Sequence, residues 1–467
     1  MMTQHKQIVI VGGGITGLTT AYYLKQHIET ASLPYDVKLV EASSRFGGKI
    51  RTLRRDGFTI ERGPDSFLAR KQPAVKLAEA LGMENELVRN GTGQSYIMTH
   101  DQLHKMPQGA FMGIPTQIKP FLFSGIFSKR GKLKAGMDLV KPKSKPQTDQ
   151  SLGGFFRHRF GDELVESLVE PLLSGIYAGD IDKMSLMATF PNFYKLEQEY
   201  GSLIKGLQKT MPKRKKSKGK KPGMFFSFKG GLESMIERLV EALGDEIPFT
   251  DTAVDHIEKK PYGYHILLDN AEVLKADAVV MASPHYTLPN VFSQYDFFKA
   301  FNDVPSTSVA NVALAFDESD IKQDIDGTGF VISRNSDYRI TAVTWTHKKW
   351  PHAAPDGKAL VRCYVGRPDD QQAVDLSDEE IIDIVMKDLN KTMDIKADPE
   401  FSVITRWKNA MPQYTVGHKE RLEGVREQME VKLPGVMLAG SSYEGIGVPD
   451  CIAQGEAAAQ RVLDFLR

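Results

Sequence analysis

The first residues that could do chemistry form a glycine-rich turn near the start of the chain. The turn is Gly12-Gly13-Gly14-Ile15-Thr16-Gly17, and it follows the apolar run Ile8 to Val11. A turn of this spacing binds the pyrophosphate of a dinucleotide, because its glycines allow a tight bend, a close backbone approach and helix–strand packing. The phosphates then lie against amide N–H groups at the start of the helix.

Glu41 supplies the second half of such a site. It ends another apolar run, Val37 to Val40, and Ala42 follows it. A carboxylate at this place accepts hydrogen bonds from a ribose diol and repels a ribose phosphate. We therefore expect a βαβ unit that binds FAD or NAD in preference to NADP, with Glu41 and Ala42 beside the nucleotide.

A further glycine segment follows Glu41 directly. It reads Arg45-Phe46-Gly47-Gly48-Lys49-Ile50-Arg51. Paired glycines let the backbone lie against a flat or charged group, and the flanking cations suit a diphosphate. Gly48 and Lys49 are therefore predicted cofactor contacts.

Composition excludes several classes of function. The 467 residues suggest two or three domains, and the formal charge of +1 gives no reason to expect a nucleic-acid partner. Cys363 and Cys451 are too few for a disulfide framework or a cysteine metal site, so no metal is expected. A reducing, cytoplasmic setting is predicted.

No membrane span or signal peptide is expected, because the first residues are polar and no run of about 18 apolar residues occurs. The apolar segment 106–127 could form a pocket wall or touch a membrane. The basic block Lys213 to Lys221 is interpreted as a solvated loop, with contact to an anionic membrane or nucleic acid as the alternative.

The order of apolar patterns predicts an α/β protein whose dinucleotide-binding domain is discontinuous. Its expected parts are residues 1–66, 223–300 and 433–467, because strand, glycine turn and helix patterns recur in the later stretches. Residues 67–210 have mostly helical periodicity and are predicted to form a cap and substrate pocket. Residues 301–432 are rich in strand patterns and are predicted to form a β-rich substrate domain.

The acid of Glu41 followed by the basic Gly-Gly segment resembles the superfamily of FAD-dependent oxidases that includes amine oxidases, phytoene desaturases and porphyrinogen oxidases. Three more segments are similar to the porphyrinogen oxidase branch: Glu61 to Phe67, Glu170 to Asp180, and Gly440 to Cys451. The resemblance runs nearly end to end. It implies FAD in an extended pose and a Rossmann-like domain of the GR2 type.

The resemblance also implies which residues contact the cofactor and the substrate. Flavin-side contacts are expected from Gly63, Pro64, Asp65, Ser66, Trp407, Gly440, Ile446, Gly447 and Val448, and an adenine-side contact from Val254. For the substrate, Lys71 is expected to face a propionate, with Arg334 a weaker candidate. Ser174, Gly175, Ile176 and Tyr177 are expected to form the wall of the pocket. Plain core packing is the alternative for Val254 and Trp407, a surface position for Lys71, and anchoring of a turn for Tyr177.

The resemblance implies a six-electron oxidation of coproporphyrinogen III, in three rounds of hydride removal to FAD, with dioxygen as acceptor and hydrogen peroxide as by-product. Transient contact with a ferrochelatase is implied as well. Protoporphyrinogen IX is the second candidate substrate. An amine or amino-acid oxidase of the same fold is a third possibility, and a flavin-containing binding protein without turnover is a fourth.

Overall fold

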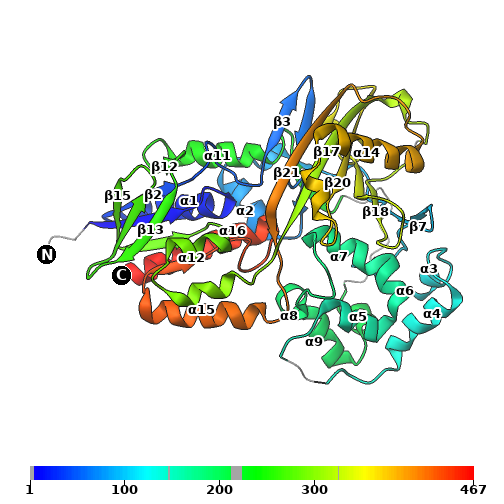
Figure 1. The fold of residues 1–467 in the computed structure, drawn as a ribbon, viewed down its shortest axis with the longest axis horizontal. Coiled ribbons are helices and arrows are strands. Elements are labelled where there is room, and N and C mark those ends of the chain that lie inside the picture. Colours follow the sequence, from blue (N-terminus) through cyan, green and yellow to red (C-terminus); the bar gives the residue numbers. More distant parts are fainter. Residues whose placement is uncertain (1–4, 146–147, 212–222, 324) are drawn as a thin grey trace.

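A parallel five-stranded sheet forms one end of the molecule. A computed structural model describes residues 5–145, 148–211, 223–323 and 325–467. The strand order is β12-β2-β1-β16-β22 (Figure 1). The bounds are β12 (Pro248–Phe249), β2 (Tyr35–Val40), β1 (Lys6–Val11), β16 (Ala278–Met281) and β22 (Val436–Leu438). These strands come from three separate stretches of chain, which confirms the predicted discontinuous α/β fold.

Both faces of this sheet are covered, as its nearly continuous apolar strands require. Ile8 and Ile10 face a core shared with four helices, whereas Val9 and Val11 face a second core. The four helices are α1 (Ile15–Ala31), α2 (Gln72–Ala80), α11 (Glu233–Leu243) and α16 (Val448–Leu466). The second core is closed by a small antiparallel sheet and two helices, namely β13 (Val254–Lys259), β14 (Tyr264–Leu268), β15 (Val273–Ala276), α12 (Leu288–Val291) and α15 (His418–Lys432). Helix α2 packs in the dinucleotide core although it follows residue 66, the predicted end of the first part of this domain. The position of that domain boundary stays a prediction.

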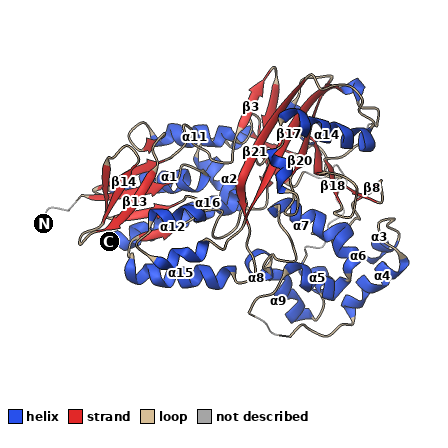
Figure 2. Ribbon diagram, in the orientation of Figure 1, coloured by secondary structure: helices blue, strands red, loops and turns tan. Residues whose placement is uncertain are grey.

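A seven-stranded sheet forms the other end, in the order β21-β17-β20-β19-β18-β7-β8 (Figure 2). Its strands are β21 (Phe401–Pro412), β17 (Ser306–Asp317), β20 (Lys358–Val365), β19 (Ile340–Trp345), β18 (Gly329–Ile332), β7 (Tyr96–Thr99) and β8 (Gln102–Lys105). Helix α14 (Asp378–Met393), which starts with a capping box at Ser377, packs on one face. The hairpin of β3 (Thr52–Arg55) and β4 (Phe58–Glu61) packs on the other face through Phe58 and Ile60. This hairpin joins the seven-stranded sheet to helix α11, which covers the five-stranded sheet.

Helices α3 to α10 form the predicted cap beside the seven-stranded sheet (Figure 1). They are α3 (Ile118–Leu122), α4 (Lys129–Gly136), α5 (Leu152–Phe160), α6 (Asp162–Leu164), α7 (Glu170–Tyr177), α8 (Leu186–Thr189), α9 (Pro191–Tyr200) and α10 (Leu203–Thr210). Buried Arg159 ties three of its segments together, pairing with Asp138 at 2.6 Å and with Glu197 at 3.0 Å. A buried ion pair is stable only when further hydrogen bonds satisfy its polar groups. Here the Arg159 guanidinium also donates to three backbone carbonyls.

The helical pattern expected across residues 70–210 needs one correction. The hairpin β7–β8 belongs to the seven-stranded sheet, and β6 (Leu87–Arg89) pairs with β11 (Phe225–Phe228), which also pairs with β5 (Phe67–Leu68). Strands this short carry too little alternation to stand out against helical periodicity, and β7 and β6 also pair with β18 and β11, which are distant in sequence.

Two segments have alternative predicted roles. The apolar segment 106–127 is a pocket wall or a membrane contact, and the basic block Lys213 to Lys221 is a solvated loop or a contact to an anionic membrane or nucleic acid. In segment 106–127, Phe121, Ile126 and Phe127 are buried in the cap core, whereas Phe123 is 88% exposed. The basic block Lys213 to Lys221 lies outside the described residues. Within the described ranges, the helices are all too short or too polar to cross a membrane.

Candidate cofactor and substrate site

The glycine turn lies between the end of β1 and the start of α1, at the carboxyl edge of the parallel sheet. Gly12 has a φ of +110°, and a Cβ on it would lie 2.9 Å from the backbone of Ala282. The Glu41 carboxylate braces the turn by accepting the N–H of Gly13 at 2.6 Å. Its other oxygen accepts two donors from Ser43. Because a carboxylate offers about four lone-pair sites, Glu41 keeps acceptor capacity for a ribose diol.

The start of α1 explains the other residues of the motif. Ile15 and Thr16 are buried, and a Cβ on Gly17 would lie 1.9 Å from the carbonyl oxygen of Gly12. Gly17 therefore lets the helix pack directly on the turn. By contrast, the space above Gly14 is open, with no atom within 4 Å of a Cβ built there. That open space is the place where a pyrophosphate could approach the backbone.

The basic Gly-Gly segment lies against the same turn. The N–H of Gly47 donates to the carbonyl of Gly13 at 2.8 Å, and a Cβ on Gly48 would lie 3.4 Å from the Cα of Gly14. Burial lowers the pKa of Lys49. Among the described residues, no carboxylate lies within 4 Å of its ammonium group, so an anionic cofactor would balance this charge.

Val254 and Ala42 lie at the Glu41 end of this region. The N–H of Thr252 donates to the carbonyl of Glu41 at 3.1 Å, which places the start of β13 beside the end of β2. Val254 is half-buried against the core of the second face, and Ala42 is exposed. Their contact with an adenine stays a prediction.

The C-terminal segment approaches the glycine turn from the other side. Gly440 has a φ of +124°, and a Cβ on it would lie 3.6 Å from the hydroxyl of Thr16. Gly447 is the N-cap of α16, and Val448 is its first residue. The amide groups at the start of this 19-residue helix carry partial positive charge. Ile446 packs against the core of the cap, so this short segment connects the dinucleotide fold to the cap.

Segment 63–66 lies between the hairpin β3–β4 and the seven-stranded sheet. The indole N–H of Trp407 donates to the carbonyl of Arg62 at 2.7 Å, and its ring lies 3.7 Å from a Cβ built on Gly63. Asp65 accepts hydrogen bonds from Ser66 and from the Lys349 ammonium at 2.8 Å. Burial raises the pKa of Asp65, but Lys349 and Arg362 outweigh burial and hold it well below its usual range. Pro64 connects these contacts within the same turn.

Helix α7 carries the residues predicted for the pocket wall. It continues from a π-helical turn, Val165–Val169, and Pro171 follows that turn. Since proline cannot donate to the helix ladder and clashes with the preceding turn, the wider turn accommodates it. Gly175 and Ile176 are exposed, whereas Tyr177 is buried and packs edge-to-face on Tyr414. Ser174 precedes them in the same helix.

Lys71 lies at the N-cap of α2 and reaches the start of α16. Its ammonium lies 2.6 Å and 2.5 Å from the two carboxylate oxygens of Asp450. Its charge is therefore already balanced by a neighbour in the first turn of α16. Arg334 lies at a different place, 3.1 Å from Asp369 and about 4 Å from Glu170 and Asp180, which flank the predicted wall in the sequence.

Several polar residues near segment 63–66 were not predicted. Asn311 on β17 and Arg362 on β20 are buried on the sheet face that meets this segment, Tyr364 on β20 is half-buried there, and Lys349 lies beside it. Each stands in an ordinary strand or loop pattern, and the bonds from Asn311, Arg362 and Lys349 to residues 61–65 join positions 250 to 299 residues apart. Only an isolated charge within an apolar strand, Arg362 in Leu360 to Val365, could have signalled a buried polar site.

The residues along this route fit a flavin dinucleotide. The open backbone at Gly14, the acceptor at Glu41 and the unbalanced cation at Lys49 suit its diphosphate and ribose. Lys49, Thr16, Lys71 and Asp450 all act on the buried Cys451 thiol, so the glycine turn and the start of α16 share one small region. From there the route continues to Gly63 and Trp407.

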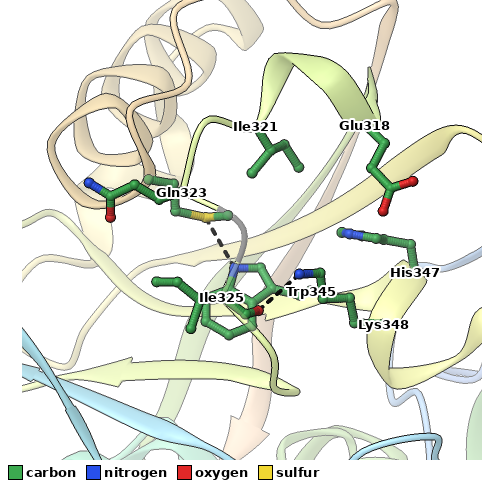
Figure 3. A pocket seen from close by; sticks show the side chains of 8 residues that line it. Glu318, Ile321, Gln323, Ile325, Trp345, His347 and Lys348 are labelled. Carbon is green, nitrogen blue, oxygen red and sulfur yellow. Dashed lines mark hydrogen bonds between the residues drawn. The ribbon is translucent and has the colours of Figure 1, made fainter.

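Two cavities elsewhere in the molecule contain none of the predicted site residues. One, of about 10 Å³, lies under α14, where the Trp345 indole donates to the sulfur of Met393 at 3.1 Å (Figure 3). The second, of about 460 Å³, lies on the cap and is lined by side chains of both charges, including Arg130, Lys134, Asp162, Glu163 and Glu166. Their positions separate them from the route described above.

Comparisons with known proteins agree with this geometry. The family model of the flavin containing amine oxidoreductases matches residues 15–463. Coproporphyrinogen III oxidase of Bacillus subtilis (strain 168) is 51% identical over 463 residues, which cover 99% of this chain and 98% of that protein. Coproporphyrinogen III oxidase of Staphylococcus aureus (strain NCTC 8325 / PS 47) is 46% identical, with 98% and 99% covered. The crystal structure of an Exiguobacterium sp. 255-15 protein assigned as a protoporphyrinogen oxidase is 39% identical, has a TM-score of 0.87 and covers 98% of both chains.

The chain therefore belongs to the flavin containing amine oxidoreductase family. Its cofactor is FAD, as the resemblance implied. When bound, FAD supplies two-electron oxidation, and the protein supplies its position and electrostatic surroundings.

We expect Gly14→Val to fold normally and to lose FAD. Gly14 has φ −70° and ψ 177°, an extended conformation that valine adopts, and a Cβ built there meets no other protein atom within 4 Å. It would occupy the space over the turn where phosphate must approach. Flavin absorbance and circular dichroism of the purified variant test this. Gly424→Val, at an exposed glycine of α15 with equal free space, is the control and should keep its FAD. A fully yellow Gly14→Val protein would contradict the cofactor site.

We also expect Glu61 to make stability depend on pH. Burial raises its pKa from 4.5 to about 7, although hydrogen bonds from Leu232 and Thr52 and the charge of Arg362 act the other way. Because the folded state binds this proton more tightly than the unfolded chain, stability is lost as pH rises from about 4.5 to 7. The loss relative to Glu61→Gln is expected to reach about 3 kcal/mol. Chemical unfolding of both holoproteins across this range measures it, and parallel pH profiles would exclude a buried, titrating Glu61.

Proposed function

We propose that this protein oxidises coproporphyrinogen III to coproporphyrin III, with FAD as cofactor, in the biosynthesis of porphyrins and heme. The reaction removes six electrons in three rounds, and dioxygen takes them up to give hydrogen peroxide. The observation that carries the proposal is the identity of 51% and 46% with two coproporphyrinogen III oxidases over nearly the whole chain. Protoporphyrinogen IX is the second candidate substrate, favoured by the likeness to the Exiguobacterium structure.

The exposed backbone of α7 supports a flat substrate. Gly175 is exposed and a Cβ on it would meet no atom within 4 Å, and Ile176 beside it is 44% exposed. A glycine on this surface permits close approach of a macrocycle, and an exposed apolar side chain suits its face. In this proposal Ser174 to Tyr177 form the pocket wall, while Gly63 to Ser66, Trp407 and Ile446 to Val448 line the flavin.

Lys71 has a narrower proposed role. Its bond to Asp450 places a cation at the start of α16, next to Ile446 to Val448. A propionate could share this ammonium, since it has three donors and lies on a partly exposed side chain. Arg334 remains a second candidate, although three carboxylates already surround it.

The cellular location and the reaction that follows are also part of the proposal. We place the protein in the cytoplasm, where reduced buried thiols such as Cys363 and Cys451 persist. The product still lacks a metal, so transient contact with a ferrochelatase is proposed as the next step of the sequence.

Turnover of a chemically reduced substrate tests the function. In aerobic buffer, the holoprotein is expected to convert coproporphyrinogen III into a fluorescent porphyrin and to release hydrogen peroxide, faster than it converts protoporphyrinogen IX. A panel of amines should give no peroxide. Preference for protoporphyrinogen IX would select the second candidate, amine turnover would select an amine oxidase, and silence with every substrate would indicate a binding protein.

We expect Gly175→Val to lower kcat/KM for coproporphyrinogen III at least tenfold, because the new side chain projects from the proposed wall. A tenfold loss is about 1.4 kcal/mol of transition-state stabilisation. FAD content should stay unchanged, since the glycine turn proposed to bind the pyrophosphate lies outside this helix. Gly136→Val is the matched control, as this cap glycine also has no atom within 4 Å of a Cβ. Equal kinetics of the two variants would remove α7 from the pocket wall.

A further inference from the structure

The seven-stranded sheet carries a layer of buried and half-buried polar side chains on the face toward segment 63–66. Asn311 pairs with Tyr364 across strands β17 and β20, and Ala313 pairs with Arg362. Since opposite residues and alternate residues of a strand share a face, Asn311, Arg362 and Tyr364 all point to the same side. The Asn311 amide donates to the carbonyl of Glu61 at 3.0 Å, which fixes that side as the one facing the hairpin β3–β4.

Arg362 is the central member of this layer. Its side chain is fully buried, and it donates to the hydroxyl of Tyr364 and, at 3.4 Å, to the carbonyl of Gly63. The nearest carboxylate oxygen, of Asp65, is 3.9 Å from Nη1. Among the described residues, neither Nε nor Nη1 has a hydrogen-bond acceptor. The guanidinium is thus buried with less compensation than is usual for a charge in a protein interior.

The charges around Arg362 do not cancel. Asp65 stays ionised because Lys349, at 2.8 Å, and Arg362 both act on it. Two cations therefore face one firmly ionised carboxylate. Glu61, the next acid, accepts the N–H of Leu232 at 2.6 Å and the hydroxyl of Thr52 at 2.8 Å, and burial favours its neutral form. The cluster of Asp65, Lys349 and Arg362 carries a net positive charge.

This charge lies directly behind the backbone proposed to line the flavin. The carbonyl of Gly63 accepts from Arg362, and the ring of Trp407 lies 3.7 Å from a Cβ built on Gly63. A charge in a poorly solvated interior acts strongly on groups a few ångströms away, because little solvent screens it. A flavin becomes more negative when it accepts electrons, so a positive charge behind Gly63 favours its reduced form.

We propose that Arg362, held by Asp65 and Lys349, is a positioning residue that fixes segment 63–66 and raises the reduction potential of FAD. The proposal deepens the proposed function, since a higher potential favours removal of hydride from a porphyrinogen. It depends on bound FAD and not on which substrate is oxidised.

The experiment measures the FAD reduction potential of holoprotein variants by dye-coupled titration, without substrate. Arg362→Gln should lower the reduced-to-oxidised ratio at a fixed potential at least tenfold, which is about 30 mV for a two-electron couple. Asp65→Asn should shift the ratio in the opposite direction, because it removes the negative charge and leaves both cations. Arg362→Lys keeps the charge and should stay closer to wild type than Arg362→Gln.

Arg406→Gln is the matched control. Arg406 pairs with Ala310 in the same sheet but on the opposite face, where it donates to the carbonyls of Val374 and Leu376. Its loss should leave the potential unchanged. If Arg362→Gln does not retain FAD, Lys349→Gln removes a charge from a less buried place in the same cluster and should also lower the potential.

Shifts of the same sign in Arg362→Gln and Asp65→Asn, or an unchanged potential in every variant, would overturn the inference. These outcomes are separate from the proposed function. A wild-type protein that oxidises coproporphyrinogen III while the variants keep its potential would leave the function standing and remove the role of Arg362. Potentials that shift as expected in a protein that oxidises no porphyrinogen would support the role of Arg362 and contradict the proposed function.

Discussion

The structure depends on one constraint: at the proposed cofactor site, the backbones of separate chain segments must come together with no side chain between them and an anionic FAD. Backbone amide groups can approach a diphosphate only where no side chain intervenes. Gly14 and Gly48 meet this condition on two separate segments that lie against each other, since Gly47 donates to Gly13. Gly440 brings a third segment close to Thr16. The discontinuity of the fold serves this arrangement, because Gly14 follows β1, Gly48 follows β2 and Gly440 follows β22, three strands of the same parallel sheet.

Charge is distributed along this route in an ordered way. The Glu41 carboxylate braces the glycine turn, and Lys49 lies beyond it without a nearby acid among the described residues. Further along, Lys71 is neutralised by Asp450 at the start of α16, whereas Arg362 and Lys349 share only Asp65. In the proposed site, positive charge thus lies where a phosphate or a reduced flavin would be negative. The charge of Lys71 is instead balanced by Asp450, near the place where the cap and the dinucleotide fold meet.

The hairpin β3–β4 and the segment after it couple the two halves of the molecule. Phe58 and Ile60 pack against the seven-stranded sheet, while Glu61 accepts the N–H of Leu232, just before α11 of the dinucleotide fold, and the hydroxyl of Thr52 within the hairpin. A polar network that is buried and shared by two cores resists sliding between them, because every displaced donor or acceptor would lose its partner in a dry region. Such rigidity suits a site whose task is to hold a cofactor and a macrocycle in one geometry.

How far each feature could be read from the chain depends on how local its cause is. Gly12 to Gly17 and Glu41 could be assigned because turn, helix and acid lie within about 30 residues and each has its own steric or electrostatic reason. The buried strands around Val9, Val280 and Leu438 could be recognised as apolar runs, and so could the division into a dinucleotide fold, a cap and a β-rich part. The residues at the cap wall and along the flavin came from resemblance, since glycine, serine or tryptophan at such places has no pattern that identifies a contact.

The sequence by itself determined the cofactor class and the order of the parts, because glycine spacing and apolar periodicity act through neighbouring residues. Only the tertiary structure decided that Lys71 pairs with Asp450, that β7 and β8 complete the large sheet, and that Arg362 lies behind Gly63. Those contacts arise from strand register and sheet order between segments up to 379 residues apart. A one-residue change in register would turn Arg362 to the opposite face, and no local pattern in the chain specifies that choice.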